Sequence, residues 1–320
     1  MTLQRIFSAT ALLLALSLSG CGGSGGGGGT GGGGGTGGGT SNIYMAGVTT
    51  SPTTHNYMAT YWKNGTAINL TDGTAPAYAN AITVDSSGNI YAAGYTTSAS
   101  NNTIATYWKN GTATNLTDGT SDGVAYAIAV DSSGDVYVAG DTTSATTGKS
   151  IATYWKNGTA KNLSDGTTPA DAHAIAVDSS GNVYAAGDTT DATTGNAMAT
   201  YWKNGAATNF TDGSSYALAL AIAVDSSGNV YVVGYFYSTT TRNAIATYWK
   251  NGAATNLTDG TSYALASAIA FDSSGNVYLS GDTTSASGNA IATYWKNGTA
   301  TTLTDGSSNA VVYGMALSSQ

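Results

Sequence analysis

The sequence predicts an all-β fold, a six-bladed β-propeller with four antiparallel strands in each blade. Six near-copies of a 46–47-residue unit follow one another after residue 41. A fixed period of this length is typical of solenoids, propellers and arrays of small domains. Each unit also contains four short segments rich in β-branched and aromatic residues, separated by Asn-Gly, Ser-Gly or Asp-Gly turns. This is the pattern of a four-stranded blade.

The unit at residues 172–213 illustrates the four expected strands. They are 174–177, 183–187, 198–203 and 207–210, joined by turns such as Asp-Ser-Ser-Gly-Asn and Asn-Gly. The third strand of every unit carries Tyr-Trp-Lys, and this position holds all the tryptophans of the chain, which are Trp62, Trp108, Trp155, Trp202, Trp249 and Trp295. We expect these large side chains to form the core between blades, with a ring of sugar-stacking platforms as the alternative.

Both faces of each blade are expected to pack against neighbouring blades. Strict alternation along the inner strand places Ala125, Ala127 and Ala129 on one small-residue face and the Ile and Val side chains on the other. Along the third strand, the same alternation places Trp108 in one inter-blade gap and Tyr107 in the next.

The two ends of the repeat region predict how the ring closes. Residues 43–47 match the second strand of a unit, and residues 313–318 match the first strand. The final blade would therefore combine an inner strand from the C-terminus with the three strands within residues 43–72. Such an interlock closes a ring, whereas a linear solenoid gains nothing from a split repeat.

The phrase Ala-Ile-Ala-Val-Asp-Ser-Ser-Gly, followed by Asn or Asp and then Val-Tyr, stands at 127–137 and 174–184. It resembles the bacterial β-propeller repeats related to the NHL type. The resemblance covers about a third of each unit. It implies that the Ala-Ile-Ala-Val strand is innermost and that the Asn-Leu-Thr-Asp segment is outermost.

The first 40 residues differ from the repeat region. Arg5 precedes an apolar stretch that is too short to span a membrane, as in a secretory signal, so residues 1–20 are expected to be a signal peptide. Leu18-Ser19-Gly20-Cys21 resembles the lipobox of bacterial lipoproteins, which implies that Cys21 is lipidated. Cys21 is also the single cysteine, so no intrachain disulfide is expected.

Residues 21–40 are nearly all glycine and are expected to be a flexible tether between the lipid and a folded body at 41–320. A membrane is therefore one expected partner. Gly22 after the cysteine resembles the outer-membrane sorting pattern, so the expected location is the outer membrane or cell surface. We expect the body to be monomeric.

The chain has 18 acidic residues against 10 Lys and Arg, a formal net charge of −8 and an isoelectric point near 4.4. Every acidic residue is an aspartate. This balance argues against binding to nucleic acid through a basic surface. Most of the aspartates lie in repeated turns, where Asp hydrogen-bonds to nearby backbone. The Asp-Ser-Ser-Gly-Asn segments are interpreted as turns, since calcium loops place oxygen ligands at alternate positions.

Two of the four connections in each unit carry nearly all the sequence variation. They join the second strand to the third and the fourth to the next first strand, and alternating strand direction places both on one face of the ring. This variable face is the expected functional face, with neutral drift as the alternative. The residues two before each inner-strand Ile or its counterpart would surround the channel mouth; they are Asn80, Tyr126, His173, Leu220, Ser267 and Tyr313.

Further candidate ligand-binding residues lie close to these in sequence. Asp122 and Asp171 precede two of them, and Tyr235, Tyr237 and Arg242 form an expected aromatic and cationic cluster that could hold a glycan or peptide. No catalytic residue, metal ligand or cofactor is predicted, because the chain lacks Glu, has two scattered His and contains no nucleophile elbow or zinc-binding helix.

The sequence therefore favours a non-enzymatic binding or interaction module at the cell envelope, with a glycan or protein partner. Two alternatives remain: a structural surface or adhesion component without a discrete pocket, and a propeller hydrolase or lyase that uses Asp side chains and His173.

Overall fold

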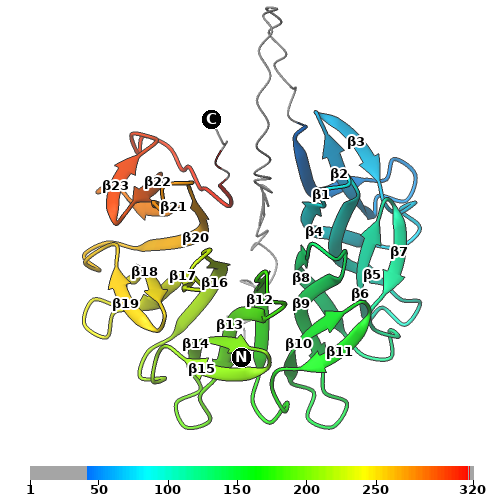
Figure 1. The fold of residues 1–320 in the computed structure, drawn as a ribbon, viewed down its shortest axis with the longest axis horizontal. Coiled ribbons are helices and arrows are strands. Elements are labelled where there is room, and N and C mark those ends of the chain that lie inside the picture. The colour runs from blue at the N-terminus through cyan, green and yellow to red at the C-terminus, as the bar shows by residue number, and fades with distance from the viewer. Residues whose placement is uncertain (1–41, 316, 318–320) are drawn as a thin grey trace, which may run out of the picture.

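The computed structural model describes residues 42–315 and 317. The predicted signal peptide, Cys21 and the whole of the predicted tether therefore lie outside the described residues. The described chain is all-β and forms a six-bladed propeller of antiparallel sheets arranged around a central axis (Figure 1). Between residues 42 and 315, no helix is long and apolar enough to cross a membrane.

The strands are described by their place in the blade. The innermost strands are β4 (Ala77–Val84), β8 (Gly123–Val130), β12 (Ala170–Val177), β16 (Ala217–Val224) and β20 (Ala264–Phe271). The second strands are β1 (Tyr44–Thr50), β5 (Ile90–Thr97), β9 (Val136–Thr143), β13 (Val183–Thr190), β17 (Val230–Tyr237) and β21 (Val277–Thr284).

The third strands carry the Tyr-Trp-Lys segment. They are β2 (Tyr57–Lys63), β6 (Thr103–Lys109), β10 (Ser150–Lys156), β14 (Ala197–Lys203), β18 (Ala244–Lys250) and β22 (Ala290–Lys296). The outermost strands are β3 (Thr66–Asn69), β7 (Thr112–Asn115), β11 (Thr159–Asn162), β15 (Ala206–Asn209), β19 (Ala253–Asn256) and β23 (Thr299–Thr302).

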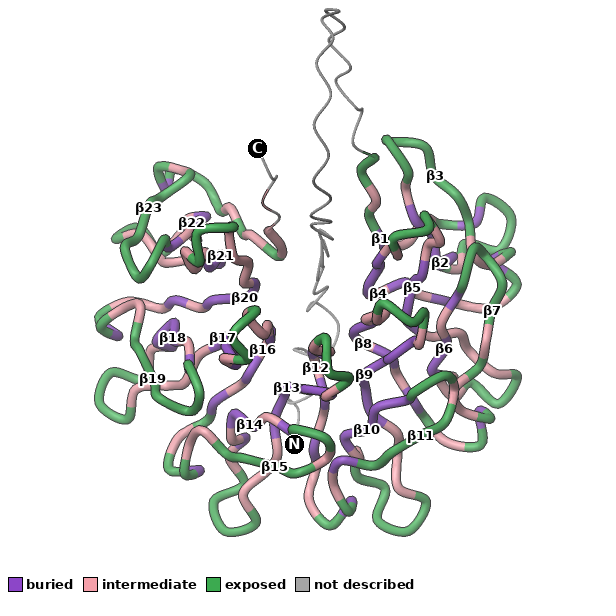
Figure 2. The backbone as a smooth tube through the Cα atoms, in the orientation of Figure 1, coloured by how far each residue is buried: buried purple, intermediate pink, exposed green. Residues whose placement is uncertain are grey.

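Burial decreases from the axis outward (Figure 2). The outermost strands are almost entirely exposed, whereas the inner and middle strands form the cores between blades. Trp202 packs in one of these cores with Tyr154 and Ile175 of the two facing blades. Five of the six tryptophans are at most 1% exposed, so the prediction of core tryptophans is confirmed at these positions, which are Trp108, Trp155, Trp202, Trp249 and Trp295.

A β-bulge in every inner strand overturns the expected small-residue face. The register of β8 on β9 shifts between Ala125 and Ala127. Ala125 consequently shares a core with Ile128, while Ala127 packs in the core on the other side of the sheet. The expectation was wrong because strict alternation holds only for a regular strand, and the extra residue of a bulge reverses the faces beyond it.

No closing strand occurs among the described residues, and residues 316 and 318 of the expected strand at 313–318 lie outside them. The sheet β1–β2–β3 has three strands, and residues 309–315 contain no strand. The sheet of β20–β23 and the sheet of β1–β3 lie at the two ends of an incomplete ring, and the chain after Thr302 returns toward the centre between them (Figure 1).

The C-terminal segment nevertheless begins to follow the path of an inner strand. Ser267 Oγ donates to the Val312 carbonyl at 2.8 Å, as Asn80 Nδ2 donates to the Ala125 carbonyl at 2.9 Å between two complete blades. Ala310 N also donates to the Ala290 carbonyl at 2.9 Å. Both contacts of the C-terminal segment are made to the neighbouring blade of β20–β23.

Candidate ligand-binding site

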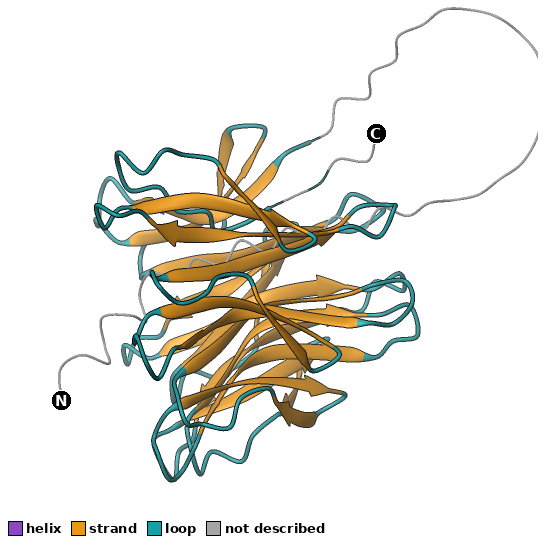
Figure 3. Ribbon diagram, turned by 90° about the vertical axis from the view of Figure 1, so that its left-hand side faces the viewer, coloured by secondary structure: helices purple, strands orange, loops and turns teal. Residues whose placement is uncertain are grey.

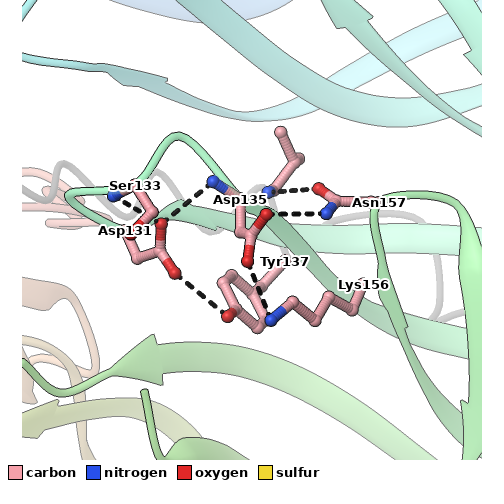
Figure 4. Close-up of polar contacts among 7 residues, drawn as sticks. Asp131, Ser133, Asp135, Tyr137, Lys156 and Asn157 are labelled. Carbon is pink, nitrogen blue, oxygen red and sulfur yellow. Dashed lines mark hydrogen bonds and ion pairs between the residues drawn. The ribbon is translucent and has the colours of Figure 1, made fainter. Parts of the chain in front are cut away.

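The Asp-Ser-Ser-Gly-Asn turns at the constant end of the blades are self-contained (Figure 4). Asp131 Oδ1 accepts hydrogen bonds from the backbone N–H groups of Ser133 and Asp135, both at 2.9 Å, and Asp131 Oδ2 accepts one from the Tyr137 hydroxyl at 3.1 Å. The carboxylate is thus already used within the turn. The interpretation of these segments as turns accounts for every one of these contacts.

A shallow hollow lies between two of these turns and is not a convincing ligand site. Its volume is about 290 Å³, and serine and carboxylate groups of the turns at Asp85 and Asp131 line it. Asp85 also accepts bonds from the Asn89 backbone and side chain and from the Tyr91 hydroxyl. Both carboxylates are therefore engaged before any ligand arrives.

The opposite end of the blades carries the variable connections, because consecutive strands are antiparallel throughout (Figure 3). In each complete blade the bulge residue of the inner strand lies near this end. In β12 this residue is His173, since the pairing with β13 skips from Ala172 to Ala174. Gly187 on β13 faces this bulge, and a Cβ there would lie 1.9 Å from the Asp171 carbonyl oxygen. Only glycine allows this close approach.

Around this bulge lies a group of five polar side chains from two neighbouring blades. We call it the acid–histidine cluster; its members are Tyr126, Asp141, Asp171, His173 and Asp188. His173 Nε2 donates to Asp188 Oδ1 at 2.8 Å. Asp171 and Asp188 are direct partners across the β12–β13 pair, so two carboxylates lie side by side. The rings of Tyr126 and His173 have centroids 5.5 Å apart.

The cluster perturbs the acidity of its members. Burial raises the pKa of Asp141 well above its usual range, and the negative charge of Asp171 raises it further. Burial, followed by the charge of Asp188, also raises the pKa of Asp171. Burial alone lowers the pKa of His173, but the hydrogen bond and charge of Asp188 outweigh it and the net shift is upward. The cluster therefore retains protons that isolated carboxylates would lose.

One atom of the cluster is unsatisfied. Asp141 is 7% exposed, and its Oδ1 atom is buried without a hydrogen-bond partner among the described residues. A buried polar group left without a partner costs about 1–3 kcal/mol, and a charged one costs more. Most buried polar groups in native structures have a hydrogen-bond partner, although Asp282 Oδ1, at the same position of another blade, also has none in the described chain.

A group of tyrosines lies next to this cluster on the variable face. We call it the tyrosine cluster; its members are Tyr216, Tyr235, Tyr237 and Tyr263. Tyr237 contacts the other three rings, at centroid distances of 5.9 Å to Tyr216, 5.7 Å to Tyr235 and 6.3 Å to Tyr263. Tyr216 is 41% exposed, so the group has an accessible side. Burial and the charge of Asp188 raise the pKa of Tyr216 to about 12, which keeps its phenol neutral at physiological pH.

A second set of three tyrosines lies on the other side of the acid–histidine cluster in chain order. The Tyr78 and Tyr95 rings are stacked with centroids 4.9 Å apart, and Tyr57 lies 5.3 Å from Tyr78. Tyr57 is exposed and belongs to the three-stranded blade. The variable face thus presents aromatic rings in the blades on either side of the acidic group.

The structure brings together five of the residues predicted from the sequence. Tyr126, Asp171 and His173 belong to the acid–histidine cluster, and Tyr235 and Tyr237 belong to the tyrosine cluster. The intervening Phe236 instead packs toward a core between blades.

The other four predicted residues lie elsewhere. Asn80 and Asp122 are engaged in structural bonds: the Asn80 amide ties two inner strands together, and Asp122 Oδ1 accepts from Thr103 N at 2.8 Å. Arg242 is exposed at a loop tip with φ +61°, and in the described chain it makes no cation–π contact with a tyrosine. Tyr313 is 45% exposed in the C-terminal segment.

Sequence reasoning missed the two aspartates that complete the cluster, Asp141 and Asp188. Both follow the glycine of the second strand, at the position where two other blades have Tyr95 and Tyr235. The available signal was an Asp inside an otherwise apolar strand rather than in a turn. Among the described residues, no group of three or more His, Cys, Asp or Glu side chains is arranged to hold a metal ion.

Comparison with known families identifies the repeat. Residues 73–100 and 117–146 match the SBBP β-propeller repeat. These segments contain the first and second strands of two blades, β4–β5 and β8–β9. The predicted bacterial β-propeller repeat is therefore confirmed. No curated protein sequence matches the chain.

Among solved structures, a polysaccharide lyase of family PL25, an ulvan lyase bound to -[GlcA(1-4)Rha3S]-, has a TM-score of 0.53 with 11% sequence identity. The match covers 82% of this chain and 80% of the lyase. A fucose lectin from Kordia zhangzhouensis in complex with methyl-fucoside has a TM-score of 0.32 with 16% identity, over 41% of this chain and 95% of the lectin. At such identity the likeness to the lyase is one of fold.

Proposed function

We propose that this chain, which carries β-propeller repeats, is a glycan-binding module whose ligand lies on the variable face against the tyrosine cluster. The four contacting rings of Tyr216, Tyr235, Tyr237 and Tyr263 are the observation that carries the proposal. Tyrosine offers an apolar ring face together with a hydroxyl group, which suits a sugar ring with C–H faces and hydroxyl edges. Tyr235 and Tyr237 lie on β17, and their ring contacts with Tyr216 and Tyr263 limit the side-chain entropy that is lost on binding.

The protonation state of the tyrosine hydroxyl groups supports the same proposal. Burial raises the pKa values of Tyr235 and Tyr263, as it does for Tyr216, so the phenols stay neutral and can donate hydrogen bonds. The neighbouring carboxylates of the acid–histidine cluster can accept hydrogen bonds from sugar hydroxyl groups. The site would thus combine apolar contact with a few polar groups, as ligand sites commonly do.

We place this module at the cell envelope as part of the same proposal. A lipid on Cys21 would hold it at a membrane, and the glycine-rich residues 21–40 would let the propeller reach ligands nearby. This part of the proposal rests on the sequence of the first 40 residues.

A glycan-binding assay on residues 41–320 tests the proposal. We expect calorimetric titration with a panel of oligosaccharides to detect at least one saturable ligand. Tyr237→Ala should weaken its binding about tenfold, since an aromatic contact contributes about 0.5–1.5 kcal/mol. Ile68→Ala, on the exposed outer strand β3, should bind like the parent. A folded protein that binds no oligosaccharide in a broad panel would refute the module and favour a structural surface role.

A hydrolase or lyase is the second candidate function, and one contact favours it. His173 and Asp188 form a hydrogen-bonded pair beside the Tyr126 ring, which are residue types able to move protons. The ulvan lyase that shares this fold acts on a polysaccharide. If the parent protein releases shorter or unsaturated oligosaccharides and His173→Gln does not, the chain is an enzyme rather than a binding module. Binding without turnover would exclude the enzyme for the glycans tested.

A further inference from the structure

The acid–histidine cluster contains more acidic than basic side chains. Asp141, Asp171 and Asp188 face a single basic side chain, His173. The electrostatic partners of Asp141 and Asp171 are other aspartates and His173, with neither a lysine nor an arginine among them. Even with a protonated imidazole, the carboxylates outnumber the cations three to one.

This excess is unusual because the charges are held close together and out of water. Two of the carboxylates are direct cross-strand partners, a placement that destabilises a sheet when both are ionised. The Tyr126 hydroxyl interacts with the Asp141 carboxyl, but Asp141 Oδ1 is buried without a hydrogen-bond partner among the described residues. A positively charged hydrogen-bond donor would both balance the excess of carboxyl groups and supply a partner for Asp141 Oδ1.

We propose, resting on the glycan-binding function above, that the acid–histidine cluster binds the protonated amine of an amino sugar, so that the ligand is a cationic glycan. The amine has three N–H donors and one positive charge, which matches the missing donor and the excess of carboxylates. Tyr126 and His173 are partly exposed at the variable end of the blades, and we place the amine beside these two rings. The adjacent tyrosine cluster then holds the following sugar rings.

The charge and arrangement of the cluster favour an amino sugar over two other kinds of ligand, a metal ion and an anionic sugar. A metal ion is disfavoured because no metal-binding arrangement of side chains occurs among residues 42–315. A uronic acid or sulfated sugar, such as the ligand of the ulvan lyase, would place a negative charge beside three carboxylates. The cluster therefore selects against the charge of that ligand although the folds are alike.

Matched oligosaccharides test the inference with residues 41–320. The probes are β-1,4-linked glucosamine oligomers and the same oligomers fully N-acetylated, which lack the charge but keep the ring. At pH 6 we expect the amine oligomer to bind at least tenfold more tightly. Titrations in two buffers of different ionisation heat should also show a proton released on binding, because the amine displaces protons held by the carboxylates.

Substitutions in the cluster test whether its carboxyl groups cause the preference for the amine oligomer. Asp141→Asn should reduce the tenfold preference to about one, measured as the ratio of the affinities for the two oligomers. Asp171→Asn is the second variant if Asp141→Asn does not fold, and it should act in the same direction. Asp272→Asn, in a turn at the other end of the blades, should keep the full preference.

The outcomes distinguish the two proposals. Equal or weaker binding of the amine oligomer, with the neutral oligomer still bound through the tyrosines, overturns the cationic-glycan inference alone. If neither oligomer nor any other glycan binds the folded protein, both proposals fall. Binding of an oligolysine peptide as tight as that of the amine oligomer would also overturn the inference, since the cluster would then recognise an amine without its sugar.

Discussion

Gly187 lies directly against the backbone carbonyl of Asp171, so close that a Cβ on Gly187 would be 1.9 Å from that oxygen. The contact occurs where β12 bulges and turns His173 toward the acid–histidine cluster. The same approach recurs in every complete blade, for example between Gly234 and the Leu218 carbonyl. The glycine and the bulge therefore occur together, and together they orient the side chain of the bulge residue.

Gly187→Ala should destabilise the protein strongly, because the methyl group meets backbone atoms that cannot rotate away. We expect a loss of about 3 kcal/mol or more, at the upper end of the cost of overpacking. Urea unfolding followed by tryptophan fluorescence measures it.

Gly181→Ala is the matched control. Gly181 has φ +79° in a turn, and its Cβ would meet nothing within 4 Å. Only the left-handed backbone conformation opposes this substitution, which should cost about 1–2 kcal/mol. Equal losses for the two variants would show that the close contact with Asp171 does not exist in solution.

The tryptophan position provides a second prediction. Trp202→Ala should cost about 3–5 kcal/mol, because the side chain is 1% exposed between two blades. Trp62→Ala should cost clearly less, because Trp62 is partly exposed on the blade at the end of the incomplete ring. Denaturant unfolding of both variants gives the comparison. Equal losses would indicate that Trp62 becomes buried, and hence that the ring closes in solution.

A third prediction concerns pH. Burial raises the pKa of Asp282 to about 6, so the native state holds this proton more tightly than the unfolded chain does, whose Asp pKa is about 3.9. Native stability is therefore lost as the pH rises from about 4 through about 6. Asp282→Asn removes this loss, so the variant should gain stability relative to the parent over that window. Thermal unfolding at a series of pH values measures it.

Asp272→Asn should show the opposite trend. The Asn276 side chain and backbone donate to Asp272 and lower its pKa, so this carboxylate stabilises the native state above its unfolded pKa. The variant should be less stable than the parent at neutral pH, and the difference should shrink as the pH falls. Parallel pH profiles for the two variants would contradict the assignment of one buried and one turn carboxylate.

The architecture could be predicted because its signals repeat. The Tyr-Trp-Lys segment recurs at a fixed spacing, and alternation on the regular third strand correctly separated Trp108 from Tyr107. The faces of the inner strand could not be predicted in the same way. A bulge adds one residue without changing composition, and so Ala125 and Ala127 lie on opposite faces.

The candidate site was predictable only in part for a related reason. His173 was predicted from its position two residues before Ile175, and Asp171 from its proximity to His173 in the sequence. Asp141 and Asp188 lie inside second strands, and their proximity to Asp171 and His173 depends on strand register and on the packing of neighbouring blades. Contacts between neighbouring blades, such as Tyr126 with His173, depend on the packing of sheets and leave no local signal.

The last prediction concerns the two blade faces at the opening of the ring. Leu303 is 58% exposed, whereas its counterpart Leu163 is 8% exposed between two blades. The segment at 310–312 already hydrogen-bonds to the last blade through Ala310 N and the Val312 carbonyl. Deleting residues 310–320 removes these bonds and uncovers β20, so we expect a markedly lower melting temperature. Ser267→Ala, which loses one bond to Val312, should cost only about 0.5–1.5 kcal/mol. An unchanged melting temperature after the deletion would show that the C-terminal segment contributes nothing to the ring, and that its resemblance to an inner strand has no structural role.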